Sequence, residues 1–539
     1  MNDNPETQYD YIIVGAGSAG AALAYRLSEN TANQVLLLEA GRASHPYSRL
    51  PVSFGLLIDH PVANWRFTSE PEAGTAKRAI PVPRGKLLGG SSSINGLVYV
   101  RGQTLDYDTW AQFGNRGWSW QDVEPLFMRM ENYEKGSNGG TRADGRGRGG
   151  PLSVTEVPDE NPLYDAMFEA AVAAGYRRNP DYNGPDQEGI VKTQATISGG
   201  RRMSTAHCYL RPAMRRGNLH VVTEALTHGL ILEGKRCLGV RYSQGGVTTE
   251  ARAGETILSA GAIGSPQILE LSGIGRPEVL QAHGITVRHE LAAVGENFRD
   301  HINARIQWKV TAPGVSYNER ARGINLVGQA LKYLATGGGF ISLPSAPLLA
   351  FLKTRPDLET PDVQMHLVPY AVKDPKRRKL HPFPSMTVAC YQLRPESLGS
   401  IHIRSAEPQA QPAIQFNFLG DQIDRDTMVE GFKMMRRIVG AAPMDPFRGE
   451  EYSPGMAIDN DEAIEQWIRD NSETAYHPIG TCRMGQGLNT VVDDQLKVHG
   501  LEGLRIADAS IFPTMPSGNT NAPSIMVGEK CADLIMASA

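Results

Sequence analysis

The chain has few cysteines and no hydrophobic run long enough to cross a membrane. Its 539 residues include five cysteines, and none of them forms a C-x-x-C pair. A disulfide framework and a cysteine-based zinc site are therefore not expected. No apolar run approaches the ~20 residues that span a bilayer, and the N-terminus lacks the basic and apolar regions of a signal peptide. We predict a protein without a transmembrane segment, located in the cytoplasm.

Charge of one sign and aromatic side chains are also scarce. Lys and Arg number 54 against 58 Asp and Glu, which gives a net charge of −4, and aromatic residues make up 7%. This balance gives no reason to expect nucleic acid or an anionic membrane as the main partner. The sequence contains neither the G-x-S-x-G elbow of serine hydrolases nor an H-E-x-x-H metal motif, so we predict no metal site.

Glycine, in contrast, is abundant, and its first cluster stands in a nucleotide-binding pattern. A short apolar strand at 11–14 leads into a glycine turn, a helix follows, and a second strand at 35–38 ends at Glu39. In such a unit the glycines allow a pyrophosphate to approach a helix N-terminus, and the acidic residue accepts hydrogen bonds from a ribose. The pattern predicts a dinucleotide site at Gly15, Gly17, Gly20 and Glu39.

Three further features favour a flavin over a nicotinamide. A second glycine-serine loop runs from Gly89 to Gly96, and a strand near the C-terminus reaches Asp508. A helix that opens at Asn521 and continues to about residue 536 would direct its positive end at a cofactor atom that becomes negative on reduction. This arrangement suits the isoalloxazine ring of a flavin better than a nicotinamide.

The middle of the chain has a different character. Segments such as 363–368 and 400–404 alternate polar and apolar residues, which is typical of an antiparallel sheet with one covered face. Short apolar runs like the strands at 11–14 and 35–38 occur at 256–262 and again at 504–509, and we expect strands there. The glycine- and arginine-rich stretch 136–150 is interpreted as a mobile surface loop rather than a nucleic-acid contact. We therefore expect one nucleotide-binding domain that is interrupted by a second domain.

Four motifs in order resemble the glucose-methanol-choline (GMC) flavin oxidoreductases over nearly the whole chain. They are 85–95 with Tyr99, Gly102 and Asp108; 261–267 continued to 271–275; 477–485; and 518–523. The resemblance implies an α/β fold, α+β overall, with a Rossmann-like FAD-binding domain and a substrate domain whose antiparallel sheet is flanked by helices. We expect the FAD domain at 1–155, 190–305 and 471–539, and the substrate domain at 156–189 and 306–470.

The same resemblance implies FAD as the cofactor and names its contacts. Some members attach FAD through a histidine just before the asparagine of the first motif, where this chain has Ile94, so non-covalent binding is expected. The predicted cofactor-binding residues are Gly15, Gly17, Ser18, Gly20, Glu39, Ala40, Leu88, Gly90, Ser91, Asn95, Gly96, Val98, Leu226, Ala260, Asp508, Ala509, Asn521 and Pro523.

His477 and Asn521 are the predicted catalytic residues. Alcohol oxidation needs a base that removes the hydroxyl proton as hydride leaves for flavin N5, and a neutral imidazole suits this task. Asn521 would hold the same oxygen, because an amide positions but cannot act as a base. Cys482 lies five residues after His477 and is interpreted as a packed thiol.

The implied reaction is the FAD-dependent oxidation of a primary alcohol to an aldehyde. The electrons would pass to a quinone-type acceptor or to oxygen, with a dehydrogenase favoured over an alcohol oxidase that forms hydrogen peroxide. A light-driven fatty acid decarboxylase remains the alternative from another class. The sequence leaves open which alcohol is the substrate, and it gives no signal for the oligomeric state.

Overall fold

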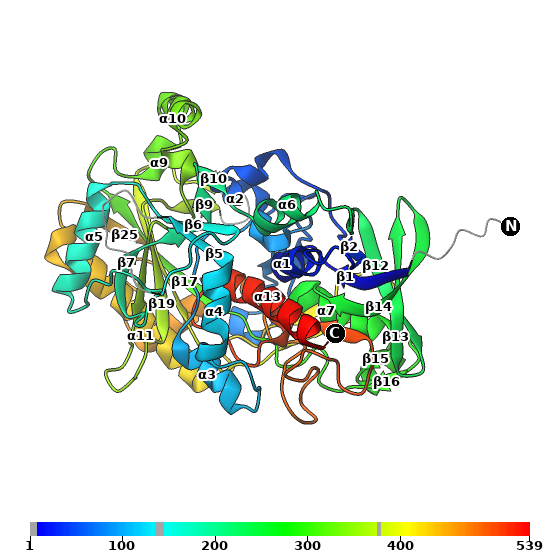
Figure 1. Cartoon of the computed structure of the whole chain (residues 1–539). Helices are drawn as coiled ribbons and strands as arrows, with labels where there is room; N and C mark the ends of the chain where they lie inside the picture. Colours follow the sequence, from blue (N-terminus) through cyan, green and yellow to red (C-terminus); the bar gives the residue numbers. More distant parts are fainter. Residues whose placement is uncertain (1–7, 135–144, 375–378, 539) are drawn as a thin grey trace.

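A computed structural model describes residues 8–134, 145–374 and 379–538. Within these ranges the chain forms two units, each built on a large sheet with its own hydrophobic core. Figure 1 shows the units side by side, with the glycine turn and the C-terminal helix in the unit that contains β1 and β2. The expected α/β organisation with an interrupting second domain is confirmed.

The first sheet carries the predicted nucleotide-binding unit. Its strand order is β11-β2-β1-β14-β13-β12, and β27 pairs with β14. Neighbouring strands from β11 to β14 run parallel, as do β14 and β27, while β12 to β14 form antiparallel hairpins. The strands are β1 Gln8–Val14, β2 Val35–Leu38, β11 Leu219–Val222, β12 Ala225–Glu233, β13 Arg236–Gln244, β14 Val247–Leu258 and β27 Leu504–Ile506.

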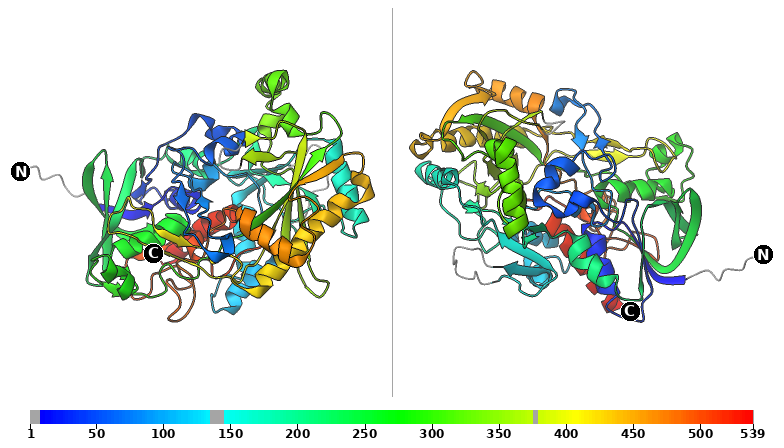
Figure 2. Two further views of the ribbon diagram at one scale, coloured as in Figure 1. Left: turned by 180° about the vertical axis from the view of Figure 1, so that it is seen from behind. Right: turned by 90° about the horizontal axis from the view of Figure 1, so that it is seen from above.

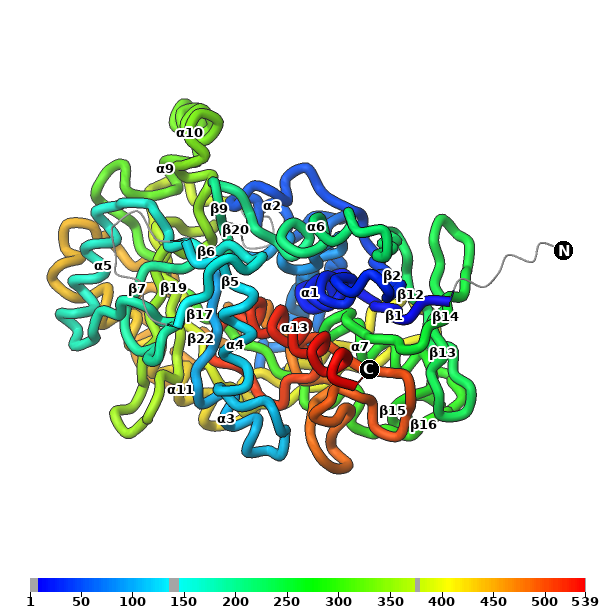
Figure 3. The backbone as a smooth tube through the Cα atoms, viewed as in Figure 1, coloured from blue at the N-terminus to red at the C-terminus, as the bar shows by residue number. Residues whose placement is uncertain are grey.

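Helices from opposite ends of the sequence pack together beside this sheet. Helix α1, Ser18–Leu27, lies along α13, Asn521–Ser538, as the tube in Figure 3 shows. The C-terminal helix therefore begins where it was predicted. The predicted strand at 256–262 ends at Leu258 because α7, Gly261–Leu271, begins three residues later. The strand predicted at 504–509 likewise ends at Ile506.

The second sheet is antiparallel, as the alternating segments predicted. Its order is β25-β17-β22-β19-β18-β7, and β26 pairs with β17. The strands are β7 Gly189–Lys192, β17 Ile302–Val310, β18 Leu348–Leu352, β19 Val363–Val368, β22 Ser385–Gln392, β25 Arg448–Ser453 and β26 Glu473–Thr474. The expected domain boundaries place most of β7 and the start of β17 in the FAD domain, whereas both strands lie in this sheet.

Both faces of the second sheet are covered, whereas the sequence suggested one. Helix α11, Gln422–Gly440, packs against β22 on one side, where it is joined by α5, Pro162–Ala173, and α12, Asp461–Asn471, as the two views in Figure 2 show. The other side faces the first unit, so every residue of β22 is buried. The predicted strand at 400–404 is instead β23, Ser400–His402, in a small separate sheet with β24, Ala413–Gln415.

The remaining helices and a small sheet complete the described chain. The helices are α2 Phe54–Leu57, α3 Thr104–Gln112, α4 Trp120–Met130, α6 Arg211–Ala213, α8 Pro277–Ala282, α9 Tyr317–Arg320 and α10 Gly323–Thr336. A three-stranded sheet contains β5 Glu131–Glu134, β6 Leu152–Glu156 and β8 Gln194–Ala195. None of the helices in the described ranges is long and apolar enough to cross a membrane.

The glycine- and arginine-rich stretch 136–150 is only partly described, since residues up to 144 lie outside the described ranges. The described part is a loop in which Gly145, Arg148 and Gly149 are exposed, but Arg146 does not lie on the surface. Arg146 is 3% exposed, because its guanidinium pairs with Glu131 at 2.6 Å and with Asp181 at 3.0 Å. This loop carries a buried ion-pair partner.

Candidate active site

A cavity of about 860 Å³ lies where the two units meet, and residues of both line it. This volume is in the range of small-molecule and cofactor sites. His477 lines the cavity, together with most of the predicted cofactor-binding residues: Gly15, Gly17, Ser18, Glu39, Ala40, Gly90, Ser91, Asn95, Gly96, Val98, Leu226, Ala260, Asp508, Ala509 and Asn521. One space therefore collects segments from the N-terminus, the middle and the C-terminus of the chain.

Three predicted residues do not line the cavity. A Cβ on Gly20 would lie 2.0 Å from the carbonyl oxygen of Gly15, so this glycine allows the turn and the helix to pack closely. Leu88 is part of the first unit's hydrophobic core. Pro523 is the third residue of α13 and is buried. These three residues therefore pack within the protein and do not face the cavity.

The glycine turn has room for a ligand at one position. Gly15 has a φ of +102°, and a Cβ there would lie 2.4 Å from the Ser259 carbonyl oxygen, so the fold itself requires glycine. Gly17 is different, since its φ is −74° and a Cβ would come no closer than 4.0 Å to any neighbour outside the turn. The open space over Gly17 matches the close backbone approach of a pyrophosphate.

Glu39 stands at the end of β2, beside the turn, as its position in the sequence predicted. Its carboxylate accepts hydrogen bonds from the backbone N–H of Ala16 at 3.0 Å and of Gly41 at 2.8 Å. Burial raises the pKa of Glu39 to about 7, although these two donors act in the opposite direction. A buried carboxylate at this edge is suited to accept hydrogen bonds from ribose hydroxyls.

Two helix N-termini open on the same cavity. The first turns of α1 and α13 line it, and the Ser18 hydroxyl donates to the side-chain oxygen of Asn521 at 2.7 Å, which links the two helix starts. The first N–H groups of a helix have no partner within the helix and carry a partial positive charge, so this end of the cavity favours an anion. At α7, the Asp508 carboxylate already accepts from the N–H of Gly261 at 2.8 Å.

Asp300 fixes the position of His477. One carboxylate oxygen accepts from the backbone N–H groups of His477 and His301, at 2.8 and 2.7 Å, and the other accepts from the Thr474 hydroxyl at 2.5 Å. The residue before His477 is Tyr476, which has a φ of +71°, uncommon for a residue with a side chain. The local backbone is thus held in a strained shape that turns His477 toward the cavity.

The hydrogen bonds of two buried histidines determine their tautomers. His301 Nε2 lies 2.9 Å from the Leu393 carbonyl oxygen, which can only accept, so this nitrogen donates. In the neutral ring Nδ1 then accepts, and it does so from Nδ1 of His477 at 2.9 Å. The Nε2 atom of His477 is consequently left with its lone pair.

Both rings are neutral because they are buried. Desolvation lowers the pKa of His301 to about 4. The pKa of His477 is lowered well below its ordinary value, first by burial and then by His301, Arg84 and His366. The lone pair on Nε2 of His477 is therefore present throughout the neutral range.

Asn519, which the sequence analysis did not select, is the amide that contacts this lone pair. Its side-chain N–H donates to His477 Nε2 at 3.0 Å. Asn521, two residues later, is engaged with Ser18 instead. Both asparagines stand in the same motif, and the sequence does not show which of the two contacts the histidine.

The second sheet forms a three-by-three polar floor under the cavity, which the sequence analysis also missed. Alternate residues of β17, β22 and β19 point to the same face, and the strand registers align them in rows. We call these nine residues the floor, and its rows are Asn303–Tyr391–Gln364, Arg305–Ala389–His366 and Gln307–Thr387–Val368. All except Gln364 line the cavity. Only the alternation was visible in the sequence, because the registers depend on long-range pairing.

No cluster in the described part of the chain resembles a metal site or a reactive thiol. No group of three or more His, Cys, Asp or Glu residues there could hold a metal ion. Cys482 is fully buried, and desolvation raises the pKa of its thiol well above the ordinary value.

Known proteins resemble this chain along almost its whole length. Family models described as GMC oxidoreductase match residues 9–303 and 395–528. An oxygen-dependent choline dehydrogenase of Brucella suis biovar 1 (strain 1330) is 41% identical over 536 residues, which cover 98% of this chain and 95% of that protein. Among solved structures, formate oxidase has a TM-score of 0.91 at 27% identity and covers 99% of both chains. Pyridoxine 4-oxidase from "Mesorbium loti" has a TM-score of 0.88 at 28% identity, over 98% of this chain and 99% of the other.

Proposed function

The chain belongs to the GMC oxidoreductase family, and we propose that it oxidises a primary alcohol to the aldehyde with FAD as cofactor and His477 as the base. The observation that supports this most is the tautomer of His477. A fixed neutral imidazole presents a lone pair to a cavity that also has the features of a dinucleotide site.

His477 and Asn519 have different roles at the substrate oxygen. The hydroxyl donates its proton to Nε2 of His477, and the amide N–H of Asn519, now 3.0 Å from that nitrogen, donates to the oxygen and holds it. FAD, when bound, supplies the acceptor for the hydride that leaves the carbinol carbon. His301 accepts from Nδ1 of His477 and so keeps the ring in the tautomer that takes up a proton at Nε2.

Gly17, Glu39 and the first turns of α1 and α13 are the residues that would hold FAD. The open space over Gly17 and the unpaired N–H groups of these helix starts fit a pyrophosphate. Ile94 lines the cavity and has no nucleophilic atom, which supports non-covalent binding. Acid precipitation is expected to release all FAD into solution, and flavin that stays on the precipitated chain would contradict this.

The electron acceptor is proposed to be a quinone-type compound. No described residue identified in the site decides between a quinone and oxygen, and the similar Brucella protein has the name oxygen-dependent choline dehydrogenase. Turnover in air is therefore compared with turnover on an artificial quinone. Hydrogen peroxide formed as fast as the quinone is reduced would make the protein an oxidase.

Anaerobic reduction of the flavin by alcohols tests the proposed function. Primary alcohols are expected to bleach the yellow protein in the dark. A light-driven decarboxylase would keep its colour with every alcohol and respond only to light together with a fatty acid. That second outcome would overturn the proposal.

A further inference from the structure

We propose that the substrate is an uncharged, largely apolar alcohol and that choline is discriminated against, although the similar Brucella protein is named a choline dehydrogenase. This inference rests on the proposed function, since it concerns the alcohol at the same site. Its basis is the charge and polarity of the residues that surround His477.

The floor beneath His477 contains no carboxylate. Its nine residues include Asn303 and Arg305, and among the described cavity-lining residues the only acids are Glu39 and Asp508. Both belong to the nucleotide end, where they accept hydrogen bonds from the starts of the glycine turn and of α7. A quaternary ammonium at the substrate end would therefore meet no counter-charge.

The acids closest to the floor are turned to other partners. Asp300 accepts from His477, His301 and Thr474 and does not line the cavity. Glu473 pairs with Asn303 across strands, but its carboxylate accepts from Arg305 at 3.0 Å and does not line the cavity. The substrate end thus presents cations and amides rather than anions.

Cations also occupy the walls near His477. Arg84 lines the cavity and donates to the Tyr476 carbonyl oxygen at 2.5 Å, and although burial lowers its pKa to about 10, it stays charged at neutral pH. Its charge is one of the causes that lower the pKa of His477. A second cation, such as choline, would be repelled from the same space.

Two of the aromatic rings that line the cavity already have a partner. Lys86 stands 4.3 Å above the Trp65 ring, and the Tyr391 ring stacks on His301 with 4.6 Å between centroids. A quaternary ammonium needs such faces or a carboxylate. The remaining wall is largely apolar and includes Val52, Phe54, Leu56, Ile58, Phe340, Leu343 and Val368. This surface suits a hydrocarbon chain or ring.

Choline and 3,3-dimethylbutan-1-ol form a matched pair, since they share a shape and differ in charge. Anaerobic flavin reduction by both alcohols is measured on the intact protein. We expect kcat/KM for the neutral alcohol to be at least ~10-fold higher, because the ammonium would lose its hydration at a site whose lining offers no counter-charge. Choline should also fail to inhibit oxidation of the neutral alcohol.

Asn303→Asp sharpens the test, because it adds a carboxylate of the same shape to the first row of the floor. This variant should lower the ratio of kcat/KM for 3,3-dimethylbutan-1-ol to kcat/KM for choline at least ~10-fold. Gln307→Glu, two rows away, should lower the same ratio less. Equal reduction by choline in the parent protein would overturn this inference alone. Flavin that no alcohol reduces would overturn the proposed function itself.

A different observation supports a second proposal, which concerns helix α10. This helix projects from the body of the second unit (Figure 1) and has no buried residue. Ile324, Val327, Leu331 and Leu334 are 82%, 52%, 63% and 80% exposed, and their spacing of three and four residues places them on one side. We infer that this apolar stripe binds the surface of an anionic lipid membrane.

The opposite side of α10 is anchored to the protein. The Tyr333 hydroxyl donates to the Gly200 carbonyl oxygen at 3.0 Å, and the Gln329 side chain accepts from the Phe340 N–H at 2.9 Å. Leu326 lies on this inner side and lines the cavity. The helix thus joins the entrance of an apolar cavity to an uncovered apolar surface, which is the arrangement a lipid-soluble alcohol or quinone needs.

Charge and length favour a membrane over a second copy of the chain. Helix α10 itself contains Lys332 and no Asp or Glu, despite the chain's net charge of −4, and a basic residue beside an apolar stripe favours anionic lipid. A coiled coil needs three or four heptads, whereas α10 spans Gly323–Thr336. A helix of this length also supplies too little area for a stable dimer.

Sedimentation with vesicles tests this surface. The parent holoenzyme should bind vesicles of phosphatidylcholine with phosphatidylglycerol and bind pure phosphatidylcholine more weakly. The double variant Ile324→Glu/Leu334→Glu should lose at least ~10-fold in binding, since each apolar side chain leaves the lipid. Leu488→Glu, at a leucine that is 95% exposed in another loop, is the matched control and should not change it. No vesicle binding, or a dimer that the double variant converts to a monomer, would overturn the proposal.

Discussion

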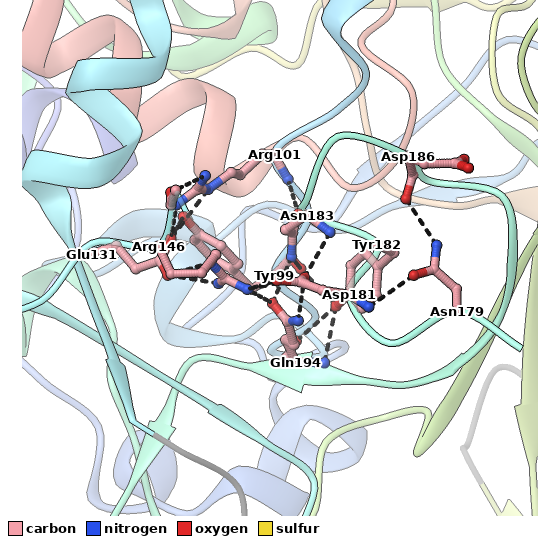
Figure 4. A network of polar contacts seen from close by, with 11 residues as sticks. Tyr99, Arg101, Glu131, Arg146, Asn179, Asp181, Tyr182, Asn183, Asp186 and Gln194 are labelled. Atoms are coloured by element: carbon pink, nitrogen blue, oxygen red, sulfur yellow. Dashed lines mark hydrogen bonds and ion pairs between the residues drawn. The ribbon is translucent and has the colours of Figure 1, made fainter. Parts of the chain in front are cut away.

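Burying a charged side chain is unfavourable, and two buried polar clusters of this protein avoid an unpaired buried charge in opposite ways. The charge cluster comprises Arg101, Glu131, Arg146 and Asp181, and Figure 4 shows their side chains meeting in one network. The histidine chain comprises Asn519, His477 and His301 and opens on the cavity. The first keeps its charges and pairs them, whereas the second removes its charges altogether.

Every charge of the charge cluster has an opposite partner. Arg101 and Arg146 both contact Glu131, at 2.5 and 2.6 Å, and Arg146 also contacts Asp181 at 3.0 Å. Gln194 adds hydrogen bonds of 2.8 Å to both Arg146 and Asp181. A closed, neutralised network of this kind holds four chain segments in place and leaves no group able to react.

In the histidine chain, the hydrogen bonds run in one direction, and the lone pair of His477 Nε2 accepts from Asn519. Asn519 donates to His477, His477 donates to His301, and His301 donates to the Leu393 carbonyl oxygen. A substrate hydroxyl that takes the place of the Asn519 contact finds a lone pair ready. The two clusters therefore differ in charge: the first is a network of paired ions, and the second is a neutral chain whose last hydrogen bond a substrate can replace.

Removing one charge from the charge cluster should give the largest loss of stability. Glu131→Gln leaves the buried Arg101 without a carboxylate and Arg146 with Asp181 alone, so the free energy of unfolding should fall by about 3–5 kcal/mol. Urea denaturation followed by tryptophan fluorescence measures this. Glu250→Gln, which breaks an exposed pair with Arg241, is the control and should cost less than about 1 kcal/mol. Equal losses would remove the distinction between buried and exposed pairs.

Truncating the histidine chain should instead affect the reaction and leave stability nearly unchanged. Asn519→Ala removes one hydrogen bond to a desolvated oxygen, worth about 1–3 kcal/mol, so flavin reduction should slow ~10–100-fold. Asn521→Ala is the matched variant, because its side chain contacts Ser18, and we expect a smaller change in this rate. A larger effect at Asn521 would return the positioning role to the residue that the sequence analysis selected.

Lowering the pH should have the smallest effect. Because the pKa of His477 lies well below the ordinary histidine value, the ring stays neutral as the pH falls from 8 to 6. The rate of flavin reduction should therefore change less than ~2-fold over this interval. A base with an ordinary pKa would lose more than half of its activity there. Stopped-flow measurements at saturating alcohol distinguish the two cases, and a titration centred near pH 6.5 would contradict the neutral chain.

The sequence predicted the nucleotide-binding unit well because its signals are local. The strand at β1, the turn at Gly15 and the carboxylate of Glu39 follow each other within about thirty residues, and each is set by side-chain size or backbone freedom. The start of α13 was also correct. Asn519 was missed because two asparagines share one motif, and which of them contacts His477 is decided by tertiary packing.

The floor and the charge cluster were missed for a similar reason. Arg305 and His366 lie on either side of Ala389 only because two strand registers align them. Arg146 stands in a stretch whose composition indicates a loop, yet its partners come from residues 15 and 35 positions away. Contacts between residues far apart in the sequence produce no periodic pattern of polar and apolar residues, so they could not be predicted.

His477 as the proton acceptor is tested most directly by anaerobic stopped-flow reduction of the flavin in the parent and in His477→Ala, across pH. The variant should be ~10²–10⁴-fold slower at neutral pH and should partly recover at high pH, where the alcohol itself ionises more often. A His477→Ala protein that binds FAD and reduces it as fast as the parent at neutral pH would contradict the assignment.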